Sequence, residues 1–163
     1  MLDPLSNLTL LSLIIFFGPK ILIAAICGGI IGFEREIKHK SAGLTTMVLM
    51  SVGSALFVAT TILLSNQQML NHISPGGAVY DPARIIAQII SGIGFIGGGV
   101  IFKVSDKISG ITTAAIIWTT CGVGILVGAG GGIFCILLSL VIVIMVFFIK
   151  LIEKKIIRKH DIS

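Results

Sequence analysis

The sequence predicts an all-α membrane protein, a polytopic helical bundle of about five transmembrane helices. Three observations support this fold class: 55% of the residues are hydrophobic, 12% are charged, and the apolar residues gather in long runs. Soluble domains carry about a quarter charged residues, whereas a membrane-spanning helix needs roughly 20 predominantly apolar ones. The 163 residues suffice for one compact helical unit without a separate soluble domain.

Five apolar segments mark the expected helices. They run approximately over residues 21–33, 44–64, 85–102, 111–127 and 133–149. The first is short, but residues 5–17 extend it or form an interfacial helix of their own, because Gly18 and Pro19 interrupt the pattern. We therefore divide the chain into an N-terminal segment at 1–20, a transmembrane domain at 21–149 and a basic cytoplasmic tail at 150–163.

Positive charges predict the orientation of the helices. Ten of the twelve Lys and Arg residues fall in three segments, residues 34–43, 103–110 and 150–163. Cytoplasmic loops carry an excess of such residues, so the pattern predicts five spans with the N-terminus outside and the C-terminus inside. The net charge of +5 thus reflects topology and suits anionic lipid heads. Its distribution argues against nucleic acid as a partner.

A glycine-rich stretch in the third segment, SGIGFIGGGV at residues 91–100, contains the dinucleotide-binding pattern G-x-G-x-x-G. That pattern requires a preceding strand and an acidic residue about 20 positions later, whereas these glycines lie inside an apolar run and are followed too early by Asp106. Packing explains them better, because small residues let membrane helices approach closely; the alternative is that they line a pathway or allow a bend. Glycine packing faces are predicted at Gly28 and Gly32, Gly94 and Gly98, and Gly124 and Gly128.

Polar residues at the start of the third segment are functional candidates, because charges are costly in a membrane. Asp81 and Pro82 suit a capped helix start, and Arg84 and Gln88 fall on the same face as Asp81. One interpretation is a capped helix with an Asp81–Arg84 contact. The other is an outer polar mouth or a partner site.

The segment Glu34-Arg35-Glu36 closes the first span. Glu34 can pair with Lys38, four residues later, at a helix end that reaches water. Alternatively, a buried Glu34–Arg35 pair locks the inner ends of neighbouring helices. Glu34 and Asp81 are both candidate ligands for Mg²⁺, which prefers oxygen ligands.

Threonines form a stripe along the fourth segment. Thr112 and Thr113 recur seven residues later as Thr119 and Thr120. Such hydroxyls bond back to their own helix, join helices or line a polar route. Between them, Trp118 is predicted to anchor packing.

The remaining reactive residue types predict no enzyme. Cys27, Cys121 and Cys135 all lie in apolar runs, which favours small apolar fillers. The three histidines form neither a metal-spaced cluster nor a triad with a serine. The residues identify no certain cofactor, and Mg²⁺ is the possible ligand.

Three stretches, at residues 28–46, 81–102 and 110–130, together resemble the MgtC/SapB family of bacterial inner-membrane proteins. The resemblance implies a five-span domain linked to magnesium homeostasis and to growth at low magnesium, at acid pH or inside host cells. It also suggests the F-type ATP synthase as a partner. The family's polar motif positions correspond here to Glu34, Arg35, Asp81, Arg84, Gln88 and Thr112.

The chain departs from the family pattern at several points. Thr112 stands where many members carry asparagine, Thr45 replaces a usual basic residue, and residues 97–100 read GGGV rather than GAGV. Many members also carry a soluble C-terminal domain, which is not expected in these 163 residues. Regulation through that domain is expected to be absent or supplied by another protein.

Regulation of a membrane partner is the function predicted for the chain, with transport of Mg²⁺ or another cation as the alternative. The apolar segments contain no acidic residue at their middle and no obvious inverted repeat, which favours regulation. The small-residue faces are consistent with a homodimer.

Overall fold

The computed structural model describes residues 9–70 and 81–160, in which five α-helices enclose a buried core. The helices are α1 (Leu10–Ile37), α2 (Leu44–Leu70), α3 (Pro82–Gly99), α4 (Ile111–Gly128) and α5 (Phe134–His160). Between α3 and α4 lies a short antiparallel hairpin of β1 (Phe102–Val104) and β2 (Lys107–Ser109). The predicted all-α bundle is confirmed, and the hairpin is an addition to it.

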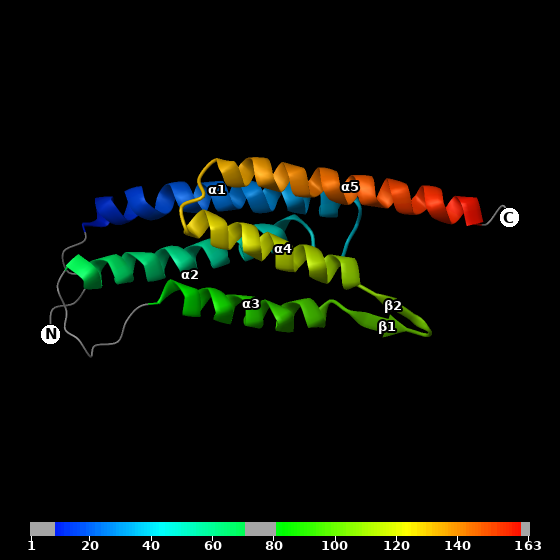
Figure 1. Ribbon diagram of the computed structural model, residues 1–163, viewed down its shortest axis with the longest axis horizontal. Helices are drawn as coiled ribbons and strands as arrows, with labels where there is room; N and C mark the ends of the chain where they lie inside the picture. Colours follow the sequence, from blue (N-terminus) through cyan, green and yellow to red (C-terminus); the bar gives the residue numbers. More distant parts are fainter. Residues whose placement is uncertain (1–8, 71–80, 161–163) are drawn as a thin grey trace.

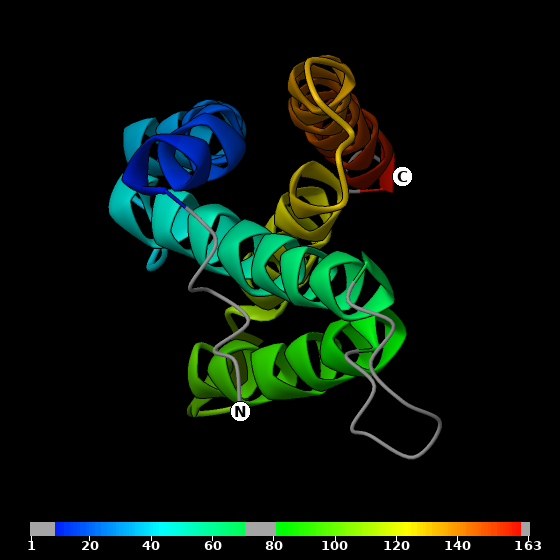
Figure 2. The same ribbon diagram turned by 90° about the vertical axis from the view of Figure 1, so that its left-hand side faces the viewer.

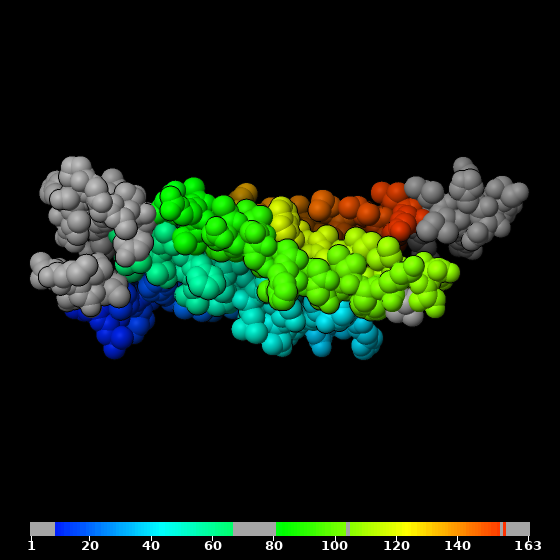
Figure 3. Space-filling view, turned by 90° about the horizontal axis from the view of Figure 1, so that it is seen from below, coloured from blue at the N-terminus to red at the C-terminus, as the bar shows by residue number. Residues whose placement is uncertain are grey.

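The helices run roughly along the long axis of the molecule (Figure 1). Viewed end-on, α1 and α5 lie on one side, α2 and α4 occupy the middle, and α3 lies on the opposite side (Figure 2). α2 packs against both α1 and α4, and α3 packs chiefly against α4. Figure 3 shows α3 and the hairpin along one face of the molecule. The C-terminal ends of α1 and α5 lie toward the same end of the bundle as the hairpin (Figure 1).

Four of the described helices, α1, α2, α4 and α5, are long and apolar enough to cross a membrane. α3, the remaining predicted span, is a helix of 18 residues but is not among these four. Its Pro82, Arg84, Gln88 and five glycines lower its mean hydropathy. The structure therefore has the five predicted helices, of which four meet the requirements for a span.

α1 is one continuous helix through Gly18 and Pro19. Residues 10–17 therefore extend the first span, and the part before Thr9 lies outside the described residues. A proline removes one backbone hydrogen bond, but membrane helices tolerate this because neighbouring groups re-satisfy the freed carbonyl. With 28 residues, α1 is about 42 Å long, more than the roughly 30 Å of bilayer hydrocarbon.

Glycines on α1 and α4 bring α2 into close contact from two sides. A Cβ atom at Gly28 would lie 2.5 Å from the Met47 carbonyl oxygen, and one at Gly128 would lie 2.5 Å from that of Ala55. Gly32 and Gly124 abut the α2 backbone in the same manner. These two glycine pairs lie at helix–helix contacts, where a larger side chain would push the helices apart.

The third predicted pair, Gly94 and Gly98, does not pack against another described segment of the chain. Apart from their own helix, no atom of residues 9–70 and 81–160 lies within 4 Å of a Cβ position at either residue. The buried face of α3 passes instead through Ile93 and Gly97, and Gly97 lies against Ala114 of α4. Gly94 follows Ile93 and Gly98 follows Gly97, so each predicted glycine lies about 100° around the helix from a buried residue. The prediction that this pair packs within the chain is therefore wrong.

Two threonines of α4 bond to their own helix, and one of them also contacts α2. Thr119 and Thr120 donate to the carbonyl oxygens of Ala115 and Ile116, each at 2.8 Å, so they bond back to their own helix. Thr120 also contacts the Met47 sulfur of α2. Trp118, expected to anchor packing, is 54% exposed. The face of α4 that packs into the bundle carries Ile117 and Thr120, both fully buried, and Trp118 lies outside that face. That expectation is wrong.

The three cysteines are free and buried. All three belong to the hydrophobic core, and Cys121 lies 2.9 Å from the Ser54 hydroxyl of α2. This placement agrees with the prediction that they fill space between helices.

Candidate functional site

A basic cavity of about 660 Å³ lies where α1 ends, the hairpin closes and α4 begins. This volume falls within the range of roughly 300–1,000 Å³ that is typical of small-molecule sites. Four parts of the chain line it: the end of α1 with the loop that follows, the hairpin, the first turn of α4, and α5. The lining residues are Arg35, His39, Lys40, Ser41, Phe102, Ile108, Ser109, Gly110, Ile111, Thr112, Thr113 and Lys150.

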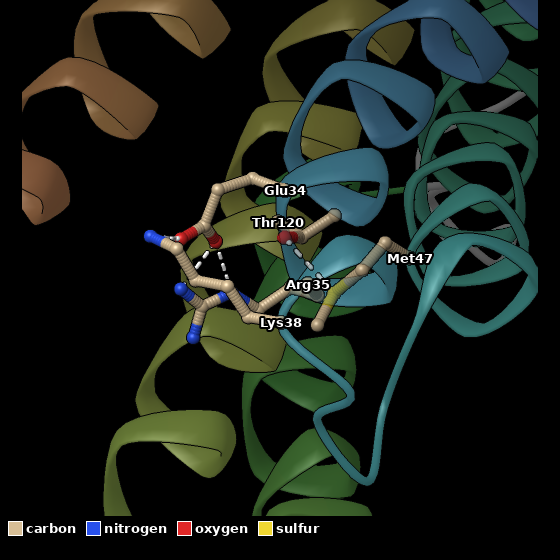
Figure 4. Close-up of polar contacts among 5 residues, drawn as sticks. All are labelled: Glu34, Arg35, Lys38, Met47 and Thr120. Atoms are coloured by element: carbon tan, nitrogen blue, oxygen red, sulfur yellow. Dashed lines mark hydrogen bonds and ion pairs between the residues drawn. The ribbon is translucent and has the colours of Figure 1, made fainter.

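Arg35 is the most deeply buried charge of this cavity, with 1% of its surface exposed. Its Nε donates a hydrogen bond to Glu34 Oε2 (Figure 4). Its Nη2 lies close enough to the same carboxylate for an ion pair but makes no hydrogen bond to any described residue. Glu34 thus contacts one edge of the guanidinium, and the rest of the Arg35 head group lines the cavity.

Glu34 is held by two cations at once. Arg35 binds its Oε2 and Lys38, the C-cap residue of α1, binds its Oε1 (Figure 4). Both contacts considered from the sequence are therefore formed. Because each lies within one helix, neither ties α1 to a neighbouring helix through Glu34, contrary to the expected lock. The carboxylate is neutralised by its own helix.

Glu36 connects α1 to α2. Its Oε2 accepts a hydrogen bond of 2.9 Å from the N–H of Leu44, the first residue of α2. The first N–H groups of a helix lack partners within it, and a carboxylate at that end is favourable to the helix dipole. Glu36 therefore acts as a cap for the next helix.

The first turn of α4 faces the cavity. Gly110, its N-cap, adopts a positive φ of 90° and offers no side-chain oxygen to the first N–H groups. A Cβ atom at Gly110 would overlap the Val100 carbonyl oxygen, so this position requires glycine. Thr113 is buried and Thr112 is exposed. The positive end of the α4 dipole and two hydroxyls thus meet the cavity.

Asp81, Arg84 and Gln88 lie at the opposite end of the bundle, at the start of α3 (Figure 1). Asp81 Oδ1 accepts a 2.9 Å hydrogen bond from the Ala83 N–H, and Pro82 occupies the first helical position. The capped start is as predicted. The expected Asp81–Arg84 contact is not formed. Both side chains are exposed, and among the described residues the two ion pairs both involve Glu34.

Acidic residues do not converge on a metal site in the described part of the chain. Glu34 and Asp81 belong to opposite ends of the bundle, so they cannot share one ion. Across residues 9–70 and 81–160, no group of three or more His, Cys, Asp or Glu side chains is placed to hold a metal.

The structure brings together three of the predicted polar candidates, Arg35, Thr112 and Thr113. Sequence reasoning missed His39, Lys40, Ser109 and Lys150 as parts of the same site. A signal for them was present: the segments predicted to share one side of the membrane, residues 34–43, 103–110 and 150–163, contribute most of the cavity lining.

Comparison with known proteins places the chain in a family. Residues 21–155 match the model of the MgtC family. The chain is 44% identical over 107 residues to "Protein MgtC" of Brucella abortus (strain 2308), which covers 66% of this chain and 40% of that protein. It is 43% identical over 112 residues to "Protein SapB" of Bacillus subtilis (strain 168), covering 68% and 47%.

A third relative is the Escherichia coli (strain K12) protein named "Putative magnesium transporter YhiD", 42% identical over 111 residues, which cover 68% of this chain and 50% of the relative. The matches span half the length of these relatives or less. No solved structure matches the chain. With four helices able to cross a membrane and the family match over residues 21–155, the chain belongs to the MgtC family and is a multi-pass protein of the bacterial inner membrane.

Proposed function

We propose that the chain acts in magnesium homeostasis by regulating a membrane partner. Family membership supports the link to magnesium, since one relative carries magnesium transport in its name. The charge distribution of the described residues supports regulation rather than conduction.

One observation carries this preference: Glu34 is already neutralised by Arg35 and Lys38. The adjacent cavity adds Lys40 and Lys150, so an approaching cation meets a positive surface. Mg²⁺ binds through carboxylates and retained waters, and Asp81, at the other end of the bundle, is hydrogen-bonded to the start of α3. A conduction path through these two carboxylates would lack a free ligand at the Glu34 end.

The partner contact is proposed on α3. The glycine pairs of α1 and α4 are covered by α2, whereas no described residue of another segment lies against Gly94 or Gly98. A small-residue face of this kind lets a second membrane helix approach closely. Its occupant would be a second copy of the chain or a membrane enzyme, for which the family resemblance suggests the F-type ATP synthase.

Transport of Mg²⁺ or another cation is the second candidate. It is favoured by the name of the Escherichia coli relative and requires that oligomer formation bring the carboxylates of several copies together.

Growth of a strain that lacks the chain tests the magnesium role. In limiting magnesium we expect a growth defect that wild-type chain restores and Gly94→Leu does not, because the added side chain blocks the open face. Gly122→Leu is the matched control, since that α4 glycine also has open space around it. Normal growth of the deletion strain at limiting magnesium would contradict the proposal.

A further inference from the structure

We propose that the basic cavity binds a phosphate-bearing anion, held by Arg35, Lys150 and the first N–H groups of α4. This proposal goes beyond the magnesium role and does not depend on it. It rests on three properties of the described residues: a buried guanidinium that Glu34 contacts along one edge only, a helix N-terminus at the same cavity, and an excess of positive charge.

The first property is the state of Arg35. Arg35 is 1% exposed and lines a cavity of about 660 Å³. Its Nη2 forms an ion pair with Glu34 but no hydrogen bond with any described residue. Glu34 fills one edge of the guanidinium through Nε. A guanidinium presents a planar fork that matches phosphate oxygens. Because Glu34 contacts only one edge of the guanidinium, the remaining N–H groups among its five donors can bind an anionic oxygen in the cavity.

The second property is the N-terminus of α4. This helix has 18 residues, and its N-cap glycine leaves the first N–H groups without a side-chain acceptor. Helix N-termini of this kind bind phosphate because the N–H groups and the helix dipole both favour negative charge. Buried Thr113 and the hydroxyl of Ser109 add donors on the same wall.

The third property is the charge of the lining. Of the described residues that line the cavity, Arg35, Lys40 and Lys150 are cationic, and none is acidic. The two acidic residues nearby are occupied: Glu34 binds Arg35 and Lys38, and Glu36 accepts from the Leu44 N–H. Carbonyl oxygens at the end of α1 accept from the N–H groups of His39 and Lys40. Both carboxylates and these carbonyl oxygens therefore already have partners within the chain.

Two sources could supply this phosphate chemistry. The cavity lies at the end of the bundle where basic segments leave the membrane, so the phosphate of an anionic lipid headgroup could enter from the side. A free phosphate could enter from water. Both would use the same donors.

Two probes distinguish these sources with the purified full-length chain. The first is inorganic phosphate, titrated against chain in a neutral detergent, with the thermal unfolding midpoint as the readout. The second is phosphatidylglycerol, offered at a low fraction in phosphatidylcholine nanodiscs, with lipid retained by the protein counted by native mass spectrometry.

Lys150→Gln is the informative variant, because Lys150 lines the cavity from α5 and is only half-buried. Lys103→Gln is the matched control: it removes an exposed positive charge from the neighbouring hairpin, outside the lining. Arg35→Lys keeps the charge but removes the fork. We expect saturable binding of one probe, unchanged in Lys103→Gln and weakened roughly tenfold in Lys150→Gln and Arg35→Lys, as for loss of one charge-assisted hydrogen bond.

A phosphate-induced rise in the unfolding midpoint would identify a free anion as the ligand. Retained phosphatidylglycerol without a phosphate response would identify a lipid headgroup. The proposal is overturned if neither probe binds to folded wild-type chain, or if Lys103→Gln and Lys150→Gln weaken binding equally. Should Arg35→Lys fail to fold, the comparison of the two lysine variants still decides.

Discussion

The carboxylate of Glu36, near the end of α1, accepts a 2.9 Å hydrogen bond from the backbone N–H of Leu44, where α2 begins. One side chain thus fixes the turn between the two helices that pack most extensively in the described structure. The same turn carries His39 and Lys40 to the basic cavity. A contact that stabilises α2 therefore also positions part of the candidate site.

Replacing Glu36 tests this cap. Glu36→Ala is expected to lower the free energy of unfolding by about 1 kcal/mol, the usual value of an N-terminal cap, as measured by SDS titration in mixed micelles. Glu36→Gln keeps an acceptor oxygen and should retain most of that stability. Equal stability of the wild type and Glu36→Ala would show that the contact contributes nothing.

Glycine packing between α4 and α2 gives a second prediction. A Cβ atom at Gly124 would overlap the backbone of Ser51, whereas one at Gly122 meets open space. Gly124→Ala should therefore destabilise the bundle by about 1–3 kcal/mol, as overpacking does. Gly122→Ala should be neutral or stabilising by up to about 1 kcal/mol through helix propensity. The same unfolding titration separates them, and matching effects would refute the packing assignment.

Removal of Glu34 should expose the cost of burying Arg35. Glu34→Ala leaves the buried guanidinium without its counter-charge, and breaking such a pair costs about 3 kcal/mol. Lys38→Ala removes the more exposed partner of Glu34 and should cost no more than about 1 kcal/mol. Thermal unfolding of both variants in detergent checks the order. A larger effect of Lys38→Ala would mean that Arg35 is not the residue that needs Glu34.

Cysteine labelling tests the proposed orientation. The native cysteines are buried, so a membrane-impermeant maleimide should leave the folded wild type unlabelled. In intact cells or spheroplasts, Ala83→Cys should react from outside, because α3 begins on the outer side in the predicted topology. Ser105→Cys, in the hairpin turn, should react only after the membrane is opened. The reverse pattern would invert the orientation.

Much of the fold was predictable because it follows from apolar segment length. Four helix starts, at Leu44, Pro82, Ile111 and Phe134, lie within three residues of the predicted ones. The start of α1 was left open between an extension of the first span and a separate helix, because Pro19 suggested a break, whereas the membrane helix accommodates this proline. The hairpin was also missed, although Ser105 and Asp106 form its two-residue turn and Ser105 has the positive φ of 54° that such turns use.

The candidate site was predictable only in part, because its residues meet through tertiary packing. Motif positions indicated Arg35 and Thr112, and the threonine stripe indicated Thr113, but neither showed that Arg35 is buried at a cavity. That state depends on the hairpin, α4 and α5 closing around the end of α1. The contact of Glu36 with Leu44 spans eight residues and follows no helical spacing. Likewise, spacing alone could not tell that Ile93 and Gly97 face α4 while Gly94 and Gly98 do not.

Magnesium flux into proteoliposomes tests most directly the claim that the chain regulates a partner rather than conducting the ion. Purified chain, shown to be folded, would be compared with empty liposomes and with Asp81→Asn and Glu34→Gln, which keep an oxygen acceptor. We predict no uptake above that of empty liposomes for any of the three proteins. Uptake by the wild type that either substitution abolishes would contradict the account and place that carboxylate on a transport path.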